Sequence, residues 1–227
     1  MQKAGLILLN GASYEQWLKK VSLPESRLVD TAAGLAKKLI ALEEHVVHSH
    51  GPEGKHEHGE MAFTTWMDMT LATEQARAIK DALARRFPQH KAQFATGFEQ
   101  LSRDLEALDS AILAAIGSSQ ACPVVFSHPV YQYFQRRYRV NGKSVHWEPD
   151  EMPDEAMWEE FRLLLQDHPA KSMLWEGEPL PAVVKKLGEL GLESAVIDPC
   201  GNTPEDGDFL TVMKANIDSV KQVYGNP

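Results

Sequence analysis

The sequence has 227 residues, of which 43% are hydrophobic and 24% are charged, enough for one large or two small hydrophobic cores. Its net charge of −9 at pH 7 argues against a nucleic-acid partner held by phosphate contacts. No apolar run approaches the ~20 residues that a membrane span needs, and the first residues lack the features of a signal peptide. The composition therefore predicts a globular chain that does not bind nucleic acid.

Short apolar runs alternate with helical patterns at the start of the chain. Segments 4–10 and 26–32 predict buried strands, and segments 13–21 and 32–45 predict helices. This alternation is typical of an α/β lobe.

The next segment, "HSHGPEGKHEHGE" at 48–60, is rich in histidine. His48, His50, His56 and His58 stand at intervals of two on either side of a Gly/Pro turn, so no helical face presents them together. A neutral imidazole is the commonest zinc ligand among side chains and suits other transition metals. The tract predicts a loop without one fixed conformation that collects metal with moderate affinity; the alternative is a solvated loop that binds nothing.

Two amphipathic helices are predicted after the histidine-rich tract, at 70–87 and 90–117. The second is long enough to act as a spine, and both apolar stripes predict ordinary core packing. The stripes consist of Ala72, Ala76, Ile79 and Leu83 in the first helix and of Phe94, Phe98, Leu101, Leu105, Leu108 and Ile112 in the second.

Beyond residue 117, a short strand and a helix alternate four times. The strands are predicted at 123–128, 143–148, 171–176 and 193–198, with helical crossovers and short loops. This order indicates a parallel sheet with helices packed on it.

A polar residue closes each of these four strands: His128, Glu148, Glu176 and Asp198. Ligands of open parallel sheets bind outside the carboxyl ends of the strands, so one edge of the sheet collects an imidazole and several carboxylates. That combination favours cation chemistry. The alternative is that these residues cap helices or belong to the solvated surface.

The two cysteines, Cys122 and Cys200, form no Cys-x-x-Cys site. Cys122 precedes the first strand of the predicted sheet and Cys200 follows the last, at opposite strand ends. A disulfide needs the two Cα atoms within ~7 Å, so the sequence predicts free thiols.

Three segments resemble one family. They are "LILLNGASYEQWL", "SHPVYQYFQRRYRV" and "VIDPCGNTPEDGDFLTVMKANIDSV", and they resemble segments of the metal-specific substrate-binding proteins of bacterial ABC transporters, which capture zinc or manganese. The resemblance implies two α/β lobes, a rigid linking helix, a metal in the cleft, a periplasmic or cell-surface location and delivery to a membrane permease. It also implies that His128 and Asp198 are metal ligands.

Two ligands that the family pattern would supply are missing here. The chain starts just before the element that follows the family's first histidine, and Thr64 stands where the second histidine would be. Histidines of the 48–58 tract, or another molecule, would have to complete the site. We therefore expect a fragment or a shortened homologue whose incomplete N-terminal lobe leaves a strand edge exposed, and which self-associates through that lobe or rearranges it.

The sequence thus predicts an α/β protein of two lobes with parallel sheets joined by a long backbone helix. Residues 1–89 form a partial N-terminal lobe with a histidine-rich loop at 45–60, 90–117 the linking helix and 118–227 the C-terminal lobe. The predicted function is that of a solute receptor for a divalent metal, zinc first and manganese as the alternative. The predicted ligands are His128, Asp198, His48, His50, His56 and His58.

Two other functions stay open from the sequence. One is a scaffold or metallochaperone-like protein that has kept the fold and lost the full cleft site. The other is a small metal-dependent hydrolase using His128 with Asp198 and Glu176. The sequence holds no G-x-S-x-G elbow, P-loop or G-x-G-x-x-G turn, so we predict a binding protein and not an enzyme.

Overall fold

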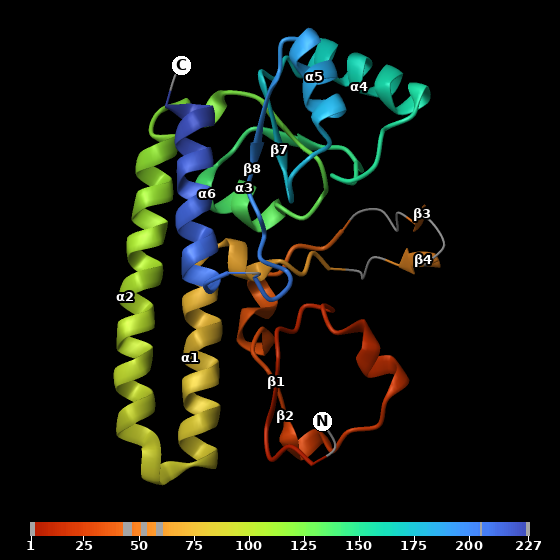
Figure 1. Ribbon diagram of the computed structural model, residues 1–227. Coiled ribbons are helices and arrows are strands. Elements are labelled where there is room, and N and C mark those ends of the chain that lie inside the picture. The colour runs from red at the N-terminus through yellow and green to blue at the C-terminus, as the bar shows by residue number, and fades with distance from the viewer. Residues whose placement is uncertain (1–2, 43–46, 51–53, 58–60, 205, 226–227) are drawn as a thin grey trace. The chain divides into compact units, whose positions relative to one another are not determined.

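The structure is a computed structural model that describes residues 3–42, 47–50, 54–57, 61–204 and 206–225 (Figure 1). It divides into two compact units, Met1–Glu106 and Ala107–Pro227, and the boundary lies inside the long helix α2 (Lys91–Ile116). No helix within the described ranges is long and apolar enough to cross a lipid bilayer.

The first unit begins with the two predicted strands, β1 (Ile7–Leu9) and β2 (Leu28–Asp30), which pair in parallel. The two predicted helices around them are 3-10 helices, Gln16–Lys20 and Ala33–Lys38. Both segments are short, and the tighter 3-10 helix is the form that short pieces commonly take. Further 3-10 turns lie at Glu25–Arg27, Thr65–Met67 and Pro88–His90, and one in the second unit at Ser119–Ala121.

Part of the histidine-rich tract forms a pair of strands where the sequence predicts a loop. Strand β3 (Val47–His50) pairs antiparallel with β4 (Gly54–Glu57), and His48 lies opposite His56 in the register. The reason is local: the two strands satisfy each other's backbone groups. His58 lies outside the described residues.

Both predicted amphipathic helices are confirmed, as α1 (Met69–Arg86) and α2. Asp68 caps α1 by accepting hydrogen bonds from the backbone N–H groups of Thr70 and Leu71. Within the first unit the two apolar stripes line a groove of about 370 Å³, and farther along α2 the stripe is buried at Leu105, Leu108 and Ile112. The groove residues are Ala76, Ile79, Lys80, Leu83, Gln93, Phe94, Gly97, Phe98 and Leu101.

The second unit contains the predicted parallel sheet, with the strand order β6-β5-β7-β8 (Figure 1). Helices α4 and α5 lie on one side of β7 and β8, and α3 and α6 lie on the other. The strands are β5 (Val124–Phe126), β6 (Gly142–Ser144), β7 (Ser172–Trp175) and β8 (Glu193–Val196). The helices are α3 (Gln132–Tyr138), α4 (Glu155–Asp167), α5 (Pro181–Glu189) and α6 (Phe209–Tyr224).

Strand β6 is shorter than the segment 143–148 predicted for it. The chain nevertheless continues along the carboxyl end of β5, because Val145 N donates to Phe126 O at 2.9 Å and Trp147 N donates to Ser127 O at 2.8 Å. These two bonds place Glu148, the residue after Trp147, beside the end of β5.

An aromatic cluster fills the core beneath this edge of the sheet. Its members come from β5, β7, α4, α5 and the segment after β6, and they are Val125, Trp147, Trp158, Phe161, Ala170, Met173, Trp175, Val183, Leu187 and Leu192. Trp147 and Trp175, which precede Glu148 and Glu176, are therefore anchored in a packed core. Cys122 is exposed, Cys200 is half-buried, and both are free thiols in the structure.

Candidate metal centre

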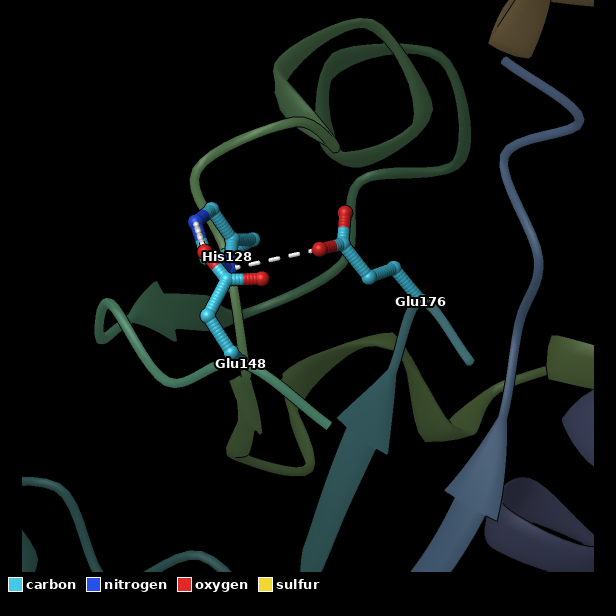
Figure 2. Close-up of side chains that lie close together, drawn as sticks. All are labelled: His128, Glu148 and Glu176. Carbon is cyan, nitrogen blue, oxygen red and sulfur yellow. Dashed lines mark ion pairs between the residues drawn. The ribbon is translucent and has the colours of Figure 1, made fainter. Parts of the chain in front are cut away.

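Three of the four polar strand-end residues meet at the carboxyl edge of the sheet (Figure 2). His128, Glu148 and Glu176 each offer one ligand atom, and these atoms all lie within 4.8 Å of one another. The strand order explains the grouping, because β5, which carries His128, lies between β6 and β7. Neighbouring strands are only ~4.8 Å apart, so side chains at their ends come within reach of a common point.

His128 is the buried member of the group, with 7% of its surface exposed. Its Nε2 lies 3.4 Å from Glu148 Oε1, and its Nδ1 lies 3.4 Å from Glu176 Oε1. The same Nδ1 is 3.3 Å from the carbonyl oxygen of Trp147, and the ring lies edge-on to His146 with centroids 5.7 Å apart. The imidazole is thus held between two carboxylates, as Figure 2 shows.

Glu148 takes its position from Trp147. The Trp147 ring is buried and packs on Trp158 with centroids 4.7 Å apart, while the backbone N–H of Trp147 donates to the carbonyl oxygen of Ser127. Immediately after Glu148 the chain turns, because Glu151 N donates to Glu148 O at 3.4 Å. The carboxylate is therefore carried by a residue fixed on one side by the aromatic core and on the other by a turn.

Glu176 follows β7, and its backbone N–H donates to Ser127 Oγ at 3.4 Å. Burial raises the pKa of the Glu176 carboxyl above its ordinary value; His128 acts in the opposite direction, and the charges of Glu148 and Asp198 raise it further. Carboxylates gathered in a half-buried site disfavour ionisation in this way, and a bound cation would reverse the effect.

The raised pKa predicts that Glu176 destabilises the metal-free protein. The pKa of a glutamate carboxyl in the unfolded chain is about 4.3. When the folded-state pKa is higher, the folded protein loses stability as the pH rises from the unfolded-state pKa through the folded-state pKa. With a chelator present, Glu176→Gln is therefore expected to raise Tm by about 2–4 °C at pH 7.5 and to lose this gain near pH 4. Circular dichroism melting curves at the two pH values measure the effect.

The matched control is Glu178→Gln, which neutralises an exposed glutamate two residues farther along the chain. It is expected to leave Tm within about 1 °C, as surface substitutions usually do. A Glu176→Gln protein that melts below the wild type at pH 7.5 would contradict the prediction.

Asp198 lies two residues beyond the end of β8, which is shorter than the predicted 193–198, and it is outside the group of three ligand atoms found among the described residues. Its strand is second from β5 in the sheet, on the far side of β7. Its Oδ1 accepts a hydrogen bond from Cys200 N at 2.6 Å. Its charge nevertheless reaches the site, since it raises the pKa of both Glu176 and the buried Tyr131. Asp198 therefore lies at the same edge of the sheet but outside the three-residue group, and we call it the outer carboxylate.

The remaining predicted ligands belong to the first unit. His48 and His50 lie on β3 and His56 on β4, whereas His58 is not among the described residues. Thr64, at the position where the sequence comparison expects a histidine, is buried. The structure thus groups His128 with two glutamates that were recognised as strand-end residues but were left out of the predicted ligand set.

The donor set fits a divalent transition metal. Zinc takes histidine nitrogen and carboxylate oxygen at ~2.0–2.2 Å, so two of its ligand atoms are at most ~4.4 Å apart. The group within 4.8 Å needs only a small contraction around the ion. Two carboxylates also neutralise the charge of a divalent cation in a half-buried place, where an unpaired charge would be costly.

Comparisons with known proteins find relatives in sequence and in fold. The curated relatives include the high-affinity zinc uptake system protein ZnuA of Yersinia pestis, 24% identical over 161 residues, which cover 68% of this chain and 50% of the relative. The chain spans about half the length of the curated relatives it matches.

Two solved structures share the fold at 18% sequence identity. Each match covers 98% of this chain and 81% of the chain in the solved structure. The metal-dependent lipoprotein YcdH of Bacillus subtilis has a TM-score of 0.80, and the Zn(II)-bound ZnuA-like domain of Streptococcus pneumoniae AdcA has one of 0.79. The family whose profile matches residues 1–223 is described as "Zinc-uptake complex component A periplasmic". The chain belongs to this family, ZnuA.

Proposed function

We propose that the chain is the solute receptor of an ABC-type uptake system and binds a divalent transition metal, zinc first, as its cargo. The observation that carries the proposal is the meeting of His128, Glu148 and Glu176 at one sheet edge. Family membership and the zinc uptake named for the relatives support it. Manganese remains the alternative cargo because carboxylate oxygen suits it.

The centre is suited to reversible binding. One buried imidazole supplies the nitrogen that transition metals prefer, and two carboxylates supply charge and oxygen atoms. Burial and the charges of Glu148 and Asp198 raise the pKa of the Glu176 carboxyl, and a bound cation would favour its ionised form. Delivery to a membrane permease, a periplasmic or cell-surface location and a binding role without catalysis belong to the same proposal, as does metal collection by His48, His50, His56 and His58.

Zinc titration by calorimetry, on chelator-treated protein, tests the proposal. Wild type is expected to bind one zinc at the centre, and Glu148→Gln and Glu176→Gln are each expected to weaken that binding by more than about 10-fold, because an amide oxygen carries no charge. The control Glu178→Gln should bind as the wild type does. Equal affinity in all four proteins would refute the ligand assignment, and a manganese titration ranks the two metals.

A second function, a scaffold that has lost metal binding, is favoured by one observation. The position of a family histidine holds Thr64, which is buried in the first unit, and threonine is a poor zinc ligand. The same titration separates the two functions. A wild-type protein that binds no zinc at the His128 centre would favour the scaffold.

A further inference from the structure

The backbone of Asp198 is held by one side chain from another element. Asn216, on α6, accepts a hydrogen bond from Asp198 N through Oδ1 at 2.9 Å and donates through Nδ2 to Asp198 O at 2.7 Å. Asn216 has only 6% of its surface exposed. Its carboxamide therefore satisfies both backbone groups of a single residue, and that residue is the outer carboxylate of the metal centre.

The position of β8 explains why such a clamp is needed. β8 is the edge strand of the sheet β6-β5-β7-β8, so the outer side of its end has no neighbouring strand in the part of the chain that the structure describes. A primary amide presents one acceptor and a donor in the geometry of a backbone peptide group. Asn216 thus replaces, at this one residue, the strand that the sheet does not provide.

A second side chain holds the preceding residue. Tyr131 OH donates to Ile197 O at 2.7 Å, and Ile197 N donates to Trp175 O at 2.8 Å. Tyr131 is fully buried and stacks on Phe126 with ring centroids 4.4 Å apart. Bonds from β7, from the segment before α3 and from α6 therefore fix two consecutive residues at the end of β8.

Helix packing alone does not require an asparagine at this place. Met213, Ile217 and Val220 already bury an apolar face of α6. A buried amide is costly unless it is hydrogen-bonded, and here its two shorter bonds go to the backbone of Asp198, while Nδ2 also lies 3.7 Å from Met213 Sδ. This placement indicates that the amide serves to orient the strand end, beyond anchoring the helix.

We propose that Asn216 is a positioning residue of the metal centre, which acts by fixing Asp198 where its carboxylate can complete the ligand set of His128, Glu148 and Glu176. The inference rests on the proposed function, since it concerns the same centre. Residues that orient a metal ligand typically change metal affinity by about 10–100-fold.

A double-mutant cycle on the full chain, read by zinc calorimetry, tests the inference. Asn216→Ala and Asp198→Ala are each expected to weaken zinc binding by about 10-fold or more, and Asn216→Ala should have no further effect on affinity in the Asp198→Ala background. Thermal melting of the same proteins should show that Asn216→Ala lowers Tm in both backgrounds. A structural role alone would not produce this difference between affinity and stability.

Two further variants complete the design. Val220→Ala shortens another buried side chain of α6; it is expected to lower Tm while leaving zinc affinity within about twofold of the wild type. Tyr131→Phe removes the bond to Ile197 from the other side, and its loss of affinity should likewise disappear in the Asp198→Ala background. It also serves as the test if Asn216→Ala does not fold.

The outcomes are distinct. Equal affinity losses for Asn216→Ala with and without Asp198, or a loss matched by Val220→Ala, would overturn the positioning role. A zinc-binding wild type whose affinity Asp198→Ala leaves unchanged would overturn the inference and leave the proposed function standing. A wild type that binds no zinc would remove the proposed function and the inference with it.

Discussion

Replacing His128 by alanine is expected to weaken zinc binding by more than about 100-fold, which exceeds the effects typical of residues outside the coordination shell. His128 is the only nitrogen donor of the described group, and it lies between the two carboxylates. Its removal takes away that nitrogen and leaves only the carboxylate oxygens of Glu148 and Glu176 in the described group. Calorimetric titration of chelator-treated protein, with competition by a chelator for the tight binding, measures the change.

Two histidine substitutions serve as controls. His90→Ala removes an exposed histidine just before α2, whose ring contacts that of Phe94, and should leave zinc affinity unchanged. His56→Ala, in the hairpin, should reduce binding by less than His128→Ala does, because several histidines of that tract can substitute for one another. An effect of His56→Ala that equals or exceeds that of His128→Ala would place the principal site in the histidine-rich tract.

The sequence predicts the edge at which this centre lies but not its members. Alternating strands and helices indicate a parallel sheet, and in such a sheet the four strand-end residues must share one edge. Which of them meet depends on the order of strands in space, and chain order does not determine it. Because β5 lies between β6 and β7, His128 meets Glu148 and Glu176, while Asp198 lies one strand farther away.

The first unit was less predictable for a different reason. Its elements are short, and over a few residues an apolar run does not distinguish an α-helix from a 3-10 helix or a loop from a hairpin. Segments 13–21 and 32–45 were predicted as helices and contain 3-10 turns, and the tract at 48–60 contains the strands β3 and β4. The long helices α1 and α2 show sustained 3.6-residue periodicity, and both were predicted correctly.

The metal centre depends on the aromatic core beneath it, so a core substitution should change both stability and zinc binding. Trp158 is fully buried, packs on Trp147 and Phe161, and has Lys186 Nζ 4.3 Å from the centre of its ring. Trp158→Ala is expected to lower the free energy of unfolding by about 3–5 kcal/mol. Urea denaturation followed by circular dichroism measures this loss.

The conservative variant Trp158→Phe separates the contribution of ring packing to stability from that of the indole N–H group. Trp158 Nε1 is buried without a hydrogen-bond partner among the described residues, so phenylalanine removes an unsatisfied donor and keeps most of the ring. We expect it to cost less than about 1.5 kcal/mol and to preserve zinc affinity. Trp158→Ala should also weaken zinc binding, because the ring of Trp147 loses its support and Glu148 follows Trp147 in the chain. If Trp158→Ala binds zinc as tightly as the wild type at a temperature where both are folded, the aromatic core does not position Glu148.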